Sequence, residues 1–490
     1  MLVAVLLMCA LLLLYAVLRD RRPRNCPPGP TEIPFFGGMP FVDEFVADKL
    51  KKNYGDIVMC RIGSYRLVLL FDYHVAKEVL ARKEFADRPS FFENMNIDDQ
   101  RTGGVLLSNG QQWQHDRRFV LRSLRDLGMG KSYLEEAINM EAEALVQDLR
   151  LYRAEAVMFP DSFRTAALNI IWQMVASTRF DLRSKEVERI YNLTKGFQRN
   201  FSVVNFIPTF IPVLDKFPEF IKNKIFGEDL FQKVLGEMRN VVRKTINEHL
   251  KEYDADHPRD LIDDYIKEMD QNSSTEGSLF RRGALDQIVN DMFQTGSDTI
   301  NNILRWVVYL LARYPEAAKR MQDQIDSVVP RDTMVSLSDK PSLPQVEAFI
   351  METLRYSSLL PIHVQRMATQ DTTIGGYFIP KGTLLRVGSY SIHFDPRYWT
   401  DPEDFNPDRF LDPSGRYVAP KNGFMAFGAG RRQCAGEVLA RTELFLFTAA
   451  IAQNFDVLPP PTTDLRRVKM TSLGGLRAPE DQELIYRPRP

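Results

Sequence analysis

The stretch that decides the fold reads Phe427-Gly-Ala-Gly430-Arg-Arg432-Gln-Cys434-Ala-Gly436. It places one cysteine in a glycine-rich loop, directly before an apolar segment, 437–454, that predicts a helix. Backbone N–H groups and a helix N-terminus favour negative charge, so we expect a lowered thiol pKa and a thiolate at Cys434. The glycines let the backbone approach a large flat group, on which Phe427 can pack and whose acidic substituent Arg432 can reach. A lone cysteine is most often an inert buried residue, so the interpretation depends on the whole loop.

A second informative segment precedes this loop. Residues 285–314 are apolar on most sides, which predicts a helix through the middle of the protein. Its centre reads Thr295-Gly296-Ser297-Asp298-Thr299. Glycine costs about 1 kcal/mol relative to alanine inside a helix, and the sequence offers no structural reason for that cost. We therefore expect the Asp298–Thr299 pair to serve a function.

Two further motifs have helical spacing. Glu352-Thr-Leu-Arg355 sets an acid and a base at i, i+3, where they can pair, although many surface helices carry such pairs. Trp113-Gln-His-Asp-Arg117 lets an indole N–H and a guanidinium reach one anion. Either motif alone is as compatible with an ordinary surface helix as with a binding site.

The coarse pattern predicts a mainly α fold with small β-sheets (α+β). Helical periodicity dominates from about residue 74 to 330, with examples at 134–149, 161–176 and 230–253. Strand signals occur at 58–62 and 66–71, joined by a turn at Gly63-Ser64, and again within 372–386 and 457–486, with a hairpin tip at Gly474-Gly475. The chain length alone suggests roughly three domains, but no repeat or flexible linker divides it, so we predict one catalytic domain.

Composition excludes several functional classes. The 63 Lys and Arg residues nearly balance the 64 Asp and Glu residues, which argues against a nucleic-acid-binding protein. The four cysteines are too few and too scattered for a disulfide framework or a CxxC zinc site, and no two of the six histidines lie at i, i+4.

The N-terminus predicts a membrane anchor. Residues 2–18 are uncharged and apolar, at the short end of the length that spans a bilayer. A cleaved signal peptide is the alternative, but no basic residue precedes the run and four arginines follow within residues 19–24. Positive flanks stay on the cytoplasmic side. We predict an uncleaved anchor at 1–18, a basic and proline-rich linker at 19–34 and a catalytic domain at 35–490.

The cysteine loop matches the FxxGxRxCxG heme-binding motif at every fixed position, and by this the chain resembles the cytochrome P450 family. The resemblance implies the cytochrome P450 fold with a long central helix. It also implies heme b (iron protoporphyrin IX) as cofactor, with Cys434 as the axial thiolate ligand of the iron and Phe427 beside it.

The other motifs resemble family motifs at matching places. Glu352 and Arg355 resemble the ExxR pair and imply a buried structural network with Arg409. Trp113, Arg117, Arg366 and Arg432 correspond to the residues that hold the two heme propionates. Residues 295–299 resemble the oxygen-binding motif of a kinked helix, in which Asp298 and Thr299 are the catalytic acid–alcohol pair; Thr295 and Ile300 depart from that motif.

Two functional classes follow from the resemblance. The first is a heme-thiolate monooxygenase that inserts one oxygen atom of O₂ into a lipophilic substrate (xenobiotic, steroid or terpenoid). Its electrons come from NADPH through NADPH–cytochrome P450 reductase, with cytochrome b5 as a candidate second donor. The second is a heme-thiolate isomerase or dehydratase, or a heme-binding sensor, without O₂ activation; the acid–alcohol pair and the intact loop favour the first. A catalytic-cysteine hydrolase is more distant, because no His or Asn constellation supports it.

The anchor, the Pro-Pro-Gly-Pro hinge and the segments 83–89 and 393–402 resemble the microsomal type-2 clan, which implies the endoplasmic reticulum membrane with the catalytic domain on the cytosolic side. The candidate pocket walls are mostly apolar, with no charged anchor common to several of them, which predicts an uncharged lipophilic substrate. These walls are 91–107, 201–212, 292–299, 359–364 and 472–476.

Overall fold

The computed structural model describes residues 22–31, 44–98, 100, 102–128, 132–189, 191–192, 210, 214, 218–473 and 475–490. The predicted anchor at residues 2–18 lies outside these ranges. Among the helices of the described ranges, none combines the length and the apolar character needed to cross a membrane. The proline-rich segment is described in part and lies against strand β1 (Ile57–Ile62), where the N–H of Met59 donates to the carbonyl of Pro28 (2.8 Å).

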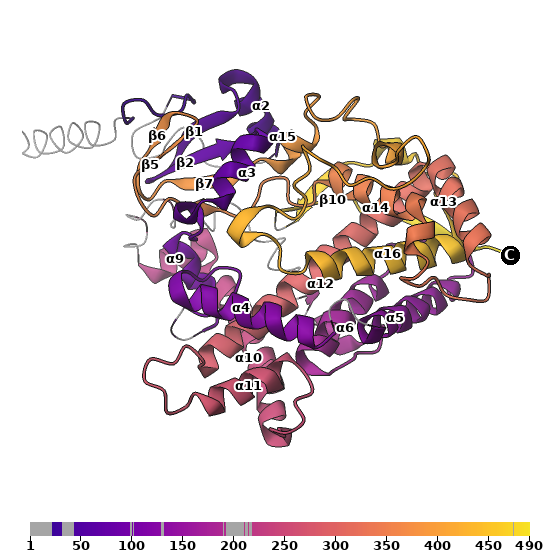
Figure 1. Ribbon diagram of the computed structural model, residues 1–490, viewed down its shortest axis with the longest axis horizontal. Coiled ribbons are helices and arrows are strands. Elements are labelled where there is room, and N and C mark those ends of the chain that lie inside the picture. Colours follow the sequence, from indigo (N-terminus) through magenta and orange to yellow (C-terminus); the bar gives the residue numbers. More distant parts are fainter. Residues whose placement is uncertain are drawn as a thin grey trace, which may run out of the picture.

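Helices fill most of the molecule (Figure 1). The α-helices of the described residues are α2 (Glu44–Tyr54), α3 (Tyr73–Ala81), α4 (Gly110–Asp126), α5 (Ser132–Arg150), α6 (Ser162–Ala176), α9 (Glu219–Phe226), α10 (Glu228–Glu252), α11 (Leu261–Gln271), α12 (Arg282–Arg313), α13 (Pro315–Val328), α14 (Pro344–Ser357), α15 (Ser389–His393) and α16 (Glu437–Asn454). The five helices predicted by range are confirmed, as α5, α6, α10, α12 and α16.

Helix α12 is the central element of the core. Its side chains are buried on most sides, and Trp306 and Tyr309 are among the largest fully buried residues. Helix α6 packs along it, and α10, α14 and α16 also contact it. The prediction of a helix through the middle of the protein is therefore confirmed, and α12 connects distant parts of the site described below.

A four-stranded sheet lies at one end of the molecule (Figure 1), with the strand order β1-β2-β7-β4. Strand β1 pairs antiparallel with β2 (Tyr65–Leu70), as predicted, and β2 pairs in parallel with β7 (Leu384–Val387). Strand β4 (Arg366–Met367) pairs antiparallel with β7. One face of the sheet carries Leu69 and Leu384 and packs with residues of α2; the other carries Leu385 and packs with residues of α3.

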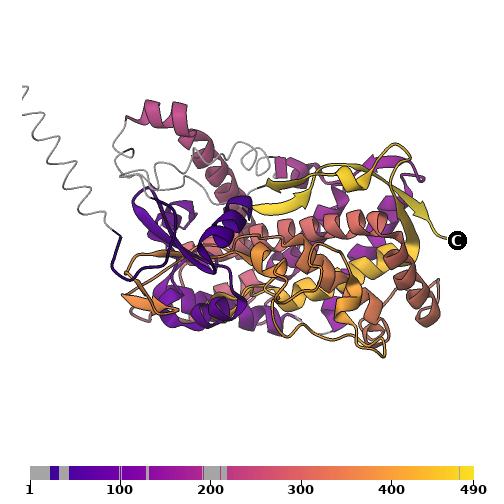
Figure 2. The ribbon, with the colours of Figure 1, turned by 90° about the horizontal axis from the view of Figure 1, so that it is seen from above.

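The remaining strands form small sheets. All but one of them overlap the predicted segments 372–386 and 457–486; the short strand Ala156–Met158 was not predicted, because it lies in a region whose pattern is mainly helical. Three of them are ordered β3 (Ala156–Met158), β11 (Glu483–Pro488) and β8 (Phe455–Leu458). Two hairpins pair β5 (Thr372–Ile374) with β6 (Tyr377–Ile379), and β9 (Met470–Leu473) with β10 (Leu476–Pro479). The second hairpin closes at the predicted tip, of which Gly475 is described and Gly474 is not. The C-terminal strands, yellow in Figure 2, run along the helical part of the molecule.

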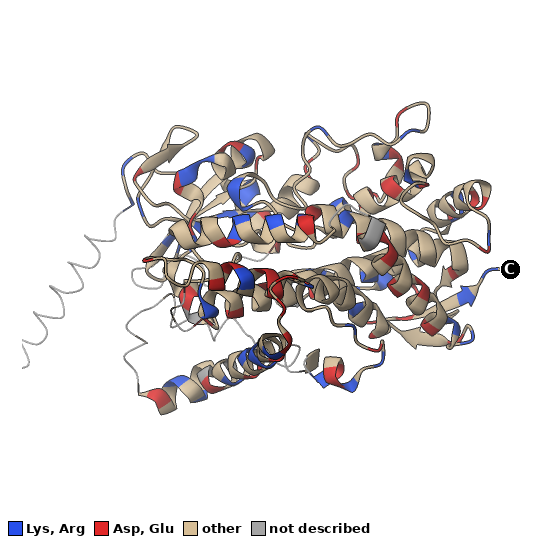
Figure 3. Cartoon of the chain, turned by 60° about the horizontal axis from the view of Figure 1, so that its bottom comes forward, with Lys and Arg blue, Asp and Glu red and all other residues tan. Residues whose placement is uncertain are grey.

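Acidic and basic residues occur together along the helices (Figure 3). Several form ion pairs one helical turn apart, such as Lys319 with Asp323 and Arg282 with Asp286.

Candidate active site

The cysteine loop, residues 427–436, has a defined conformation. Within it, Cys434 lies between a short 3₁₀ helix, Gly430–Arg432, and the first turn of α16. The N–H of Cys434 donates to the carbonyl of Phe427 (3.0 Å), which closes the loop. Gly430 has a φ of +70°, and a Cβ at this position would lie 2.0 Å from the carbonyl oxygen of Leu80. A glycine is therefore required there for steric reasons, and Cys434 is left with accessible surface.

The expected lowering of the thiol pKa is wrong for the protein chain by itself. Burial raises the pKa of the Cys434 thiol, and the negative charge of Glu437 raises it further. The hydrogen bond from the backbone of Gly436 and the charge of Arg117 act in the opposite direction but are outweighed. A metal ion that coordinated this thiol would deprotonate it outright, which the loop by itself does not do.

Four arginine side chains gather near this loop, and they come from four different parts of the chain. Arg117 lies on α4, Arg366 on β4 and Arg432 in the 3₁₀ helix, and Arg88 precedes α4. Arg117 donates to the carbonyl of Gln433 (2.6 Å), and the other three also donate to backbone carbonyls. Within the described residues none of the four forms an ion pair with a carboxylate.

The electrostatics of these four residues, the guanidinium cluster, indicate a missing anion. Burial lowers the pKa of Arg432 to about 8, of Arg88 to about 9 and of Arg366 to about 10, and the neighbouring guanidinium charges add to each shift. Burial also lowers the pKa of Arg117. Buried cations are normally paired, because taking a charge out of water costs several kcal/mol. A bound dianion would remove this cost.

Trp113 supplies an unpartnered donor at the same place. The residue is 4% exposed, and its indole Nε1 has no hydrogen-bond partner in the described structure. The guanidinium of Arg432 lies over its ring, with Cζ 3.7 Å from the ring centroid. Buried polar groups are almost always hydrogen-bonded, so this N–H indicates a missing acceptor. The donors present thus fit the two carboxylates of heme, next to an accessible cysteine.

The predicted acid–alcohol pair on α12 is not brought together into one contact. The hydroxyl of Thr299 donates to the carbonyl of Thr295 (2.7 Å), whereas the carboxylate of Asp298 lies 3.7 Å from Arg164 of α6. Consecutive helix residues point about 100° apart, so the two side chains face different neighbours. Helix α12 runs without interruption through this motif, from Arg282 to Arg313.

Gly296 has a structural reason that sequence analysis missed. A Cβ at this position would lie 2.9 Å from the side chain of Ile171 on α6. The glycine therefore allows close packing of the two helices, so packing as well as function accounts for a glycine at this position.

The network predicted around Glu352 is confirmed. Glu352 and Arg355 are fully buried and form a bidentate ion pair, with both N–O distances 2.7 Å. Arg409 approaches Glu352 at 3.3 Å, and the N–H of Asn406 donates to the same carboxylate (2.8 Å). Arg355 also donates to the carbonyl of His393 (2.8 Å). The network joins α14 to the segment that leads into the cysteine loop.

A buried carboxylate anchors the predicted pocket wall 91–107 to the central helix. Asp291 of α12 accepts hydrogen bonds from the N–H groups of Val105 and Leu106 (2.7 and 2.9 Å). Burial raises the pKa of Asp291 to about 6, against the effect of these two bonds. The carbonyls of Val105 and Ser108 accept from Arg432, so the same loop connects α12 to the guanidinium cluster.

Sequence analysis did not select Arg88 or Asp291, although signals for both were present. Arg88 lies within the quoted segment 83–89, and Asp291 is an acid in a helix that reads as buried. Of the other predicted positions, three are buried: Trp113, Arg366 and Arg432. Phe427 is partly buried against the main core, and the guanidinium carbon of Arg441 lies 5.1 Å from the centroid of its ring. The charge of Arg117 acts on Cys434, so the two residues are neighbours.

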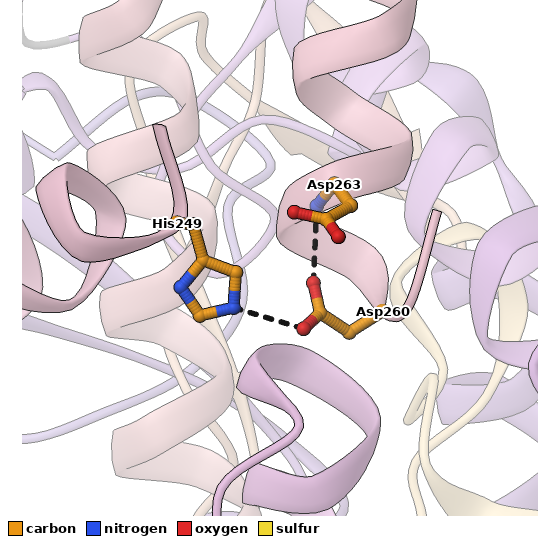
Figure 4. A group of neighbouring side chains, drawn as sticks. All are labelled: His249, Asp260 and Asp263. Atoms are coloured by element: carbon orange, nitrogen blue, oxygen red, sulfur yellow. Dashed lines mark hydrogen bonds and ion pairs between the residues drawn. The ribbon is translucent and has the colours of Figure 1, made fainter. Parts of the chain in front are cut away.

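A separate group of His249, Asp260 and Asp263 has ligand atoms close enough to suggest a metal site (Figure 4). The contacts of these residues account for them without an ion. His249 Nε2 lies 2.9 Å from Asp260, which also accepts the N–H of Asp263 as the N-cap of α11. Asp263 pairs with Arg259 (2.7 Å). We interpret the group as a structural link between α10 and α11.

Comparison with known proteins agrees with the geometry. The family model described as cytochrome P450 matches residues 27–485. Cytochrome P450 2L1 of Panulirus argus is 36% identical, and the match covers 96% of both chains. Human cytochrome P450 2C8 is 33% identical over 99% of both chains.

The chain belongs to the cytochrome P450 family.

This membership establishes the P450 fold, of mixed helices and small sheets, and an enzyme of the monooxygenase family with heme (iron protoporphyrin IX) as cofactor. The relatives include microsomal-type P450s, so the predicted resemblance to that clan is confirmed. The farnesoate epoxidase of Bombyx mori is a further relative, 30% identical over 99% of this P450 and 98% of its own length. Which residues of this P450 hold the heme remains a prediction, supported by the unpartnered donors described above.

Proposed function

We propose that this P450 inserts one oxygen atom of O₂ into a lipophilic substrate, using electrons from NADPH delivered by NADPH–cytochrome P450 reductase, with cytochrome b5 as a candidate second donor. The observation that carries the proposal is the unpaired guanidinium cluster with the orphan indole of Trp113, next to the accessible Cys434. These groups are what a heme with two propionates and an axial thiolate requires.

The proposed roles follow from the contacts. Cys434 would hold the heme iron through its thiolate. The two propionates would be held by Trp113, Arg117, Arg366 and Arg432, with Arg88 added, and Phe427 would pack beside the heme. Heme ligated by a thiolate supplies the O₂ activation. Glu352 and Arg355 take no part in the chemistry and fix the protein around it.

Thr299 and Asp298 are proposed to hold and move protons on the side of the site where the heme would activate O₂. The Thr299 hydroxyl donates to the carbonyl of Thr295 at 2.7 Å, and rotation about its C–O bond redirects the proton towards the site. The carboxylate of Asp298 lies 3.7 Å from the guanidinium of Arg164, and its side chain keeps some exposed surface (22%) through which it can exchange protons with water. This pair favours a monooxygenase over a heme-thiolate isomerase, dehydratase or sensor.

The substrate is proposed to be a xenobiotic, a steroid or a terpenoid. Support comes from the apolar residues at the pocket walls: Phe91, Phe210 and Ile362 belong to one buried cluster with strands β1 and β2. The farnesoate epoxidase among the relatives supports the terpenoid class in particular.

The proposed location is the endoplasmic reticulum membrane, with the catalytic domain, 35–490, on the cytosolic side. The support is the apolar run 2–18, the arginines of the linker 19–34 and the microsomal-type relatives. Deleting residues 1–24 should leave heme binding intact and move the protein from membranes towards the soluble fraction. Loss of heme incorporation after this deletion would contradict the proposed domain boundary.

The monooxygenase proposal is tested by reconstituting the heme-loaded chain with reductase, NADPH and isotopically labelled O₂. We screen steroids, terpenoid acids and esters, and N-alkyl drugs, and expect one labelled oxygen atom in the product, dependent on NADPH. Conversion of an organic hydroperoxide without NADPH, together with no labelled product from any compound, would instead favour the isomerase or dehydratase.

A further inference from the structure

Arg386 is a charged residue inside the four-stranded sheet. It lies on β7, which pairs with β2 on one side and β4 on the other, and it is in register with Leu69. Side chains alternate along a strand, so Arg386 shares a face with Leu384, two residues away. That face belongs to an apolar cluster that also contains Leu69 and Ile362. A guanidinium at such a position requires an explanation.

The hydrogen bonds of Arg386 leave half of its guanidinium unused. Nε donates to the carbonyl of His363 (3.0 Å), and Nη2 donates to the carbonyl of Ile362 (3.3 Å). Within the described structure Nη1 has no partner, and it is not among the side-chain nitrogens that are sealed from solvent. The free Nη1–Nη2 edge is the one that binds a carboxylate through two parallel hydrogen bonds.

No carboxylate of the described protein compensates the charge. Arg386 forms no ion pair in these ranges, and burial alone lowers its pKa to about 10. Arg355, a comparably buried arginine, is paired at 2.7 Å with Glu352. Arg386 is therefore largely surrounded by protein, retains accessible donor surface and has no acid paired with it among the described residues.

Arg386 is distinct from the guanidinium cluster that we assign to the heme propionates. Arg366 is in register with Leu385, so its side chain lies on the opposite face of the sheet and donates to the carbonyls of Leu80 and Ala429. The charges of the cluster do not contribute to the pKa shift of Arg386. A separate anion is needed to pair with it.

The surroundings of Arg386 are those expected for a lipophilic substrate. Its two acceptors, Ile362 and His363, belong to the predicted pocket wall 359–364. Residues of two other predicted walls lie in the same cluster as Ile362: the rings of Phe91 and Phe210 are 5.6 Å apart. Arg386 thus contacts one predicted wall directly, and that wall shares an apolar cluster with residues of two others. Sequence analysis missed Arg386 because it lies on a strand outside all three walls.

We propose that Arg386 binds the carboxylate of an otherwise lipophilic substrate, such as a long-chain or terpenoid acid. This inference rests on the proposed function, whose substrate class it narrows: the body of the substrate is apolar, but one end is acidic. It replaces the expectation of an uncharged substrate.

The test compares binding of matched acids and esters to the heme-loaded full-length chain. Linear acids of eight to sixteen carbons and their methyl esters are titrated, with binding followed by equilibrium dialysis and by the substrate-induced shift of the Soret band. We expect the acids to bind at least about 10-fold more tightly than their esters, because hydrogen bonds to charged groups are among the stronger ones. Arg386→Met should weaken acid binding about 10- to 100-fold and leave ester binding unchanged. Arg386→Lys should restore part of the preference, since lysine keeps the charge but not the fork.

Lys381→Met is the matched control. It removes one positive charge just before the same strand, from an exposed side chain, and should leave the acid-to-ester ratio unchanged. Equal binding of acids and esters by the wild type, no binding of any acid, or an unchanged ratio in Arg386→Met would overturn the inference. Heme loss in Arg386→Met would also overturn it, by showing a propionate role. Binding is measured without electrons, so a failure to oxidise any compound would count against the proposed monooxygenase and not against Arg386.

Discussion

The guanidinium of Arg432 lies over the indole of Trp113, with Cζ 3.7 Å from the ring centroid, and the indole N–H beside it has no partner. A charged group and an unused donor are thus fixed side by side, although each is unfavourable in a buried position. The arrangement is understandable if both bind the same anion.

Trp113→Phe is expected to weaken heme retention while preserving the fold. Phenylalanine keeps the ring under Arg432 but removes the N–H, so the propionate loses one hydrogen bond. We expect heme to dissociate about 10-fold faster or more, because a hydrogen bond to a charged group contributes about 1.5–3 kcal/mol. Transfer of heme to apomyoglobin measures the rate. An unchanged rate of heme loss would show that the indole does not hold the cofactor. Arg366→His is the control: it keeps a hydrogen-bond donor at another of the proposed propionate-binding positions, so heme should dissociate only slightly faster.

Glu352→Gln is expected to destabilise the whole protein. Removing one member of a buried pair leaves the other charge uncompensated, which costs about 3–5 kcal/mol of the free energy of unfolding. Urea unfolding, followed at the Soret band, measures the loss in free energy of unfolding. If the variant is too unstable to purify, the yield of heme-loaded protein measures the destabilisation instead. Asp323→Asn breaks the exposed pair with Lys319 and should have little effect. Equal stability of the two variants would contradict the structural role of Glu352.

Thr299→Ala is expected to separate electron use from product formation. The variant loses the hydroxyl to which we assign proton delivery, while the cysteine loop is untouched. Losing one proton-transfer group typically costs about 10²–10⁴-fold in the assisted step, so less product should form per NADPH and hydrogen peroxide should appear instead. NADPH consumption, product and peroxide are measured with one substrate. Thr299→Ser should restore coupling; undiminished coupling in Thr299→Ala would remove Thr299 from the mechanism and strengthen the isomerase interpretation.

His249→Gln is expected to change how stability depends on pH. Burial alone would lower the pKa of His249, but the hydrogen bond and charge of Asp260 outweigh it and raise this pKa above its usual value. The folded state then holds the proton more tightly than the unfolded state, so the stabilisation is complete below about pH 6.5 and disappears as the pH rises through the folded-state pKa. The stability difference between wild type and variant, from urea unfolding between about pH 6 and 9, should therefore shrink with rising pH.

His257→Gln is the matched control, because its ion pair with Asp254 is exposed and contributes little. A difference between wild type and His249→Gln that grows with pH would show that the His249–Asp260 link is not the source of this stability.

Much of the fold could be predicted because its signals are local. The apolar periodicity of 285–314 and the alternation at 58–62 and 66–71 are properties of short segments, and α12, β1 and β2 follow them closely. Similarly, the spacing within Glu352-Thr-Leu-Arg355 is enough to fix a pair on one helix face. The pairing of β2 with β7 could not be predicted, because it joins residues more than 300 positions apart.

The site was predicted less completely, for the same physical reason. Trp113 and Arg432 could be selected through the resemblance, but that the guanidinium cluster forms no ion pair within the described residues is visible only in three dimensions. Asp298 and Thr299 are neighbours in sequence, yet their side chains face different partners. Arg386 could not be recognised, because its strand gives no signal of the pocket walls that it meets in space.

The central claim is that Cys434 is the thiolate ligand of the heme iron, and one measurement tests it most directly. The spectrum of the reduced carbon monoxide complex is recorded for the wild-type chain, for Cys434→His and for Cys26→Ser, a control at a partly buried cysteine outside the loop. We predict a red-shifted Soret band in the wild type and in Cys26→Ser, and in Cys434→His bound heme without that band. Persistence of the red-shifted band in Cys434→His would show that another residue is the ligand and would contradict the assignment.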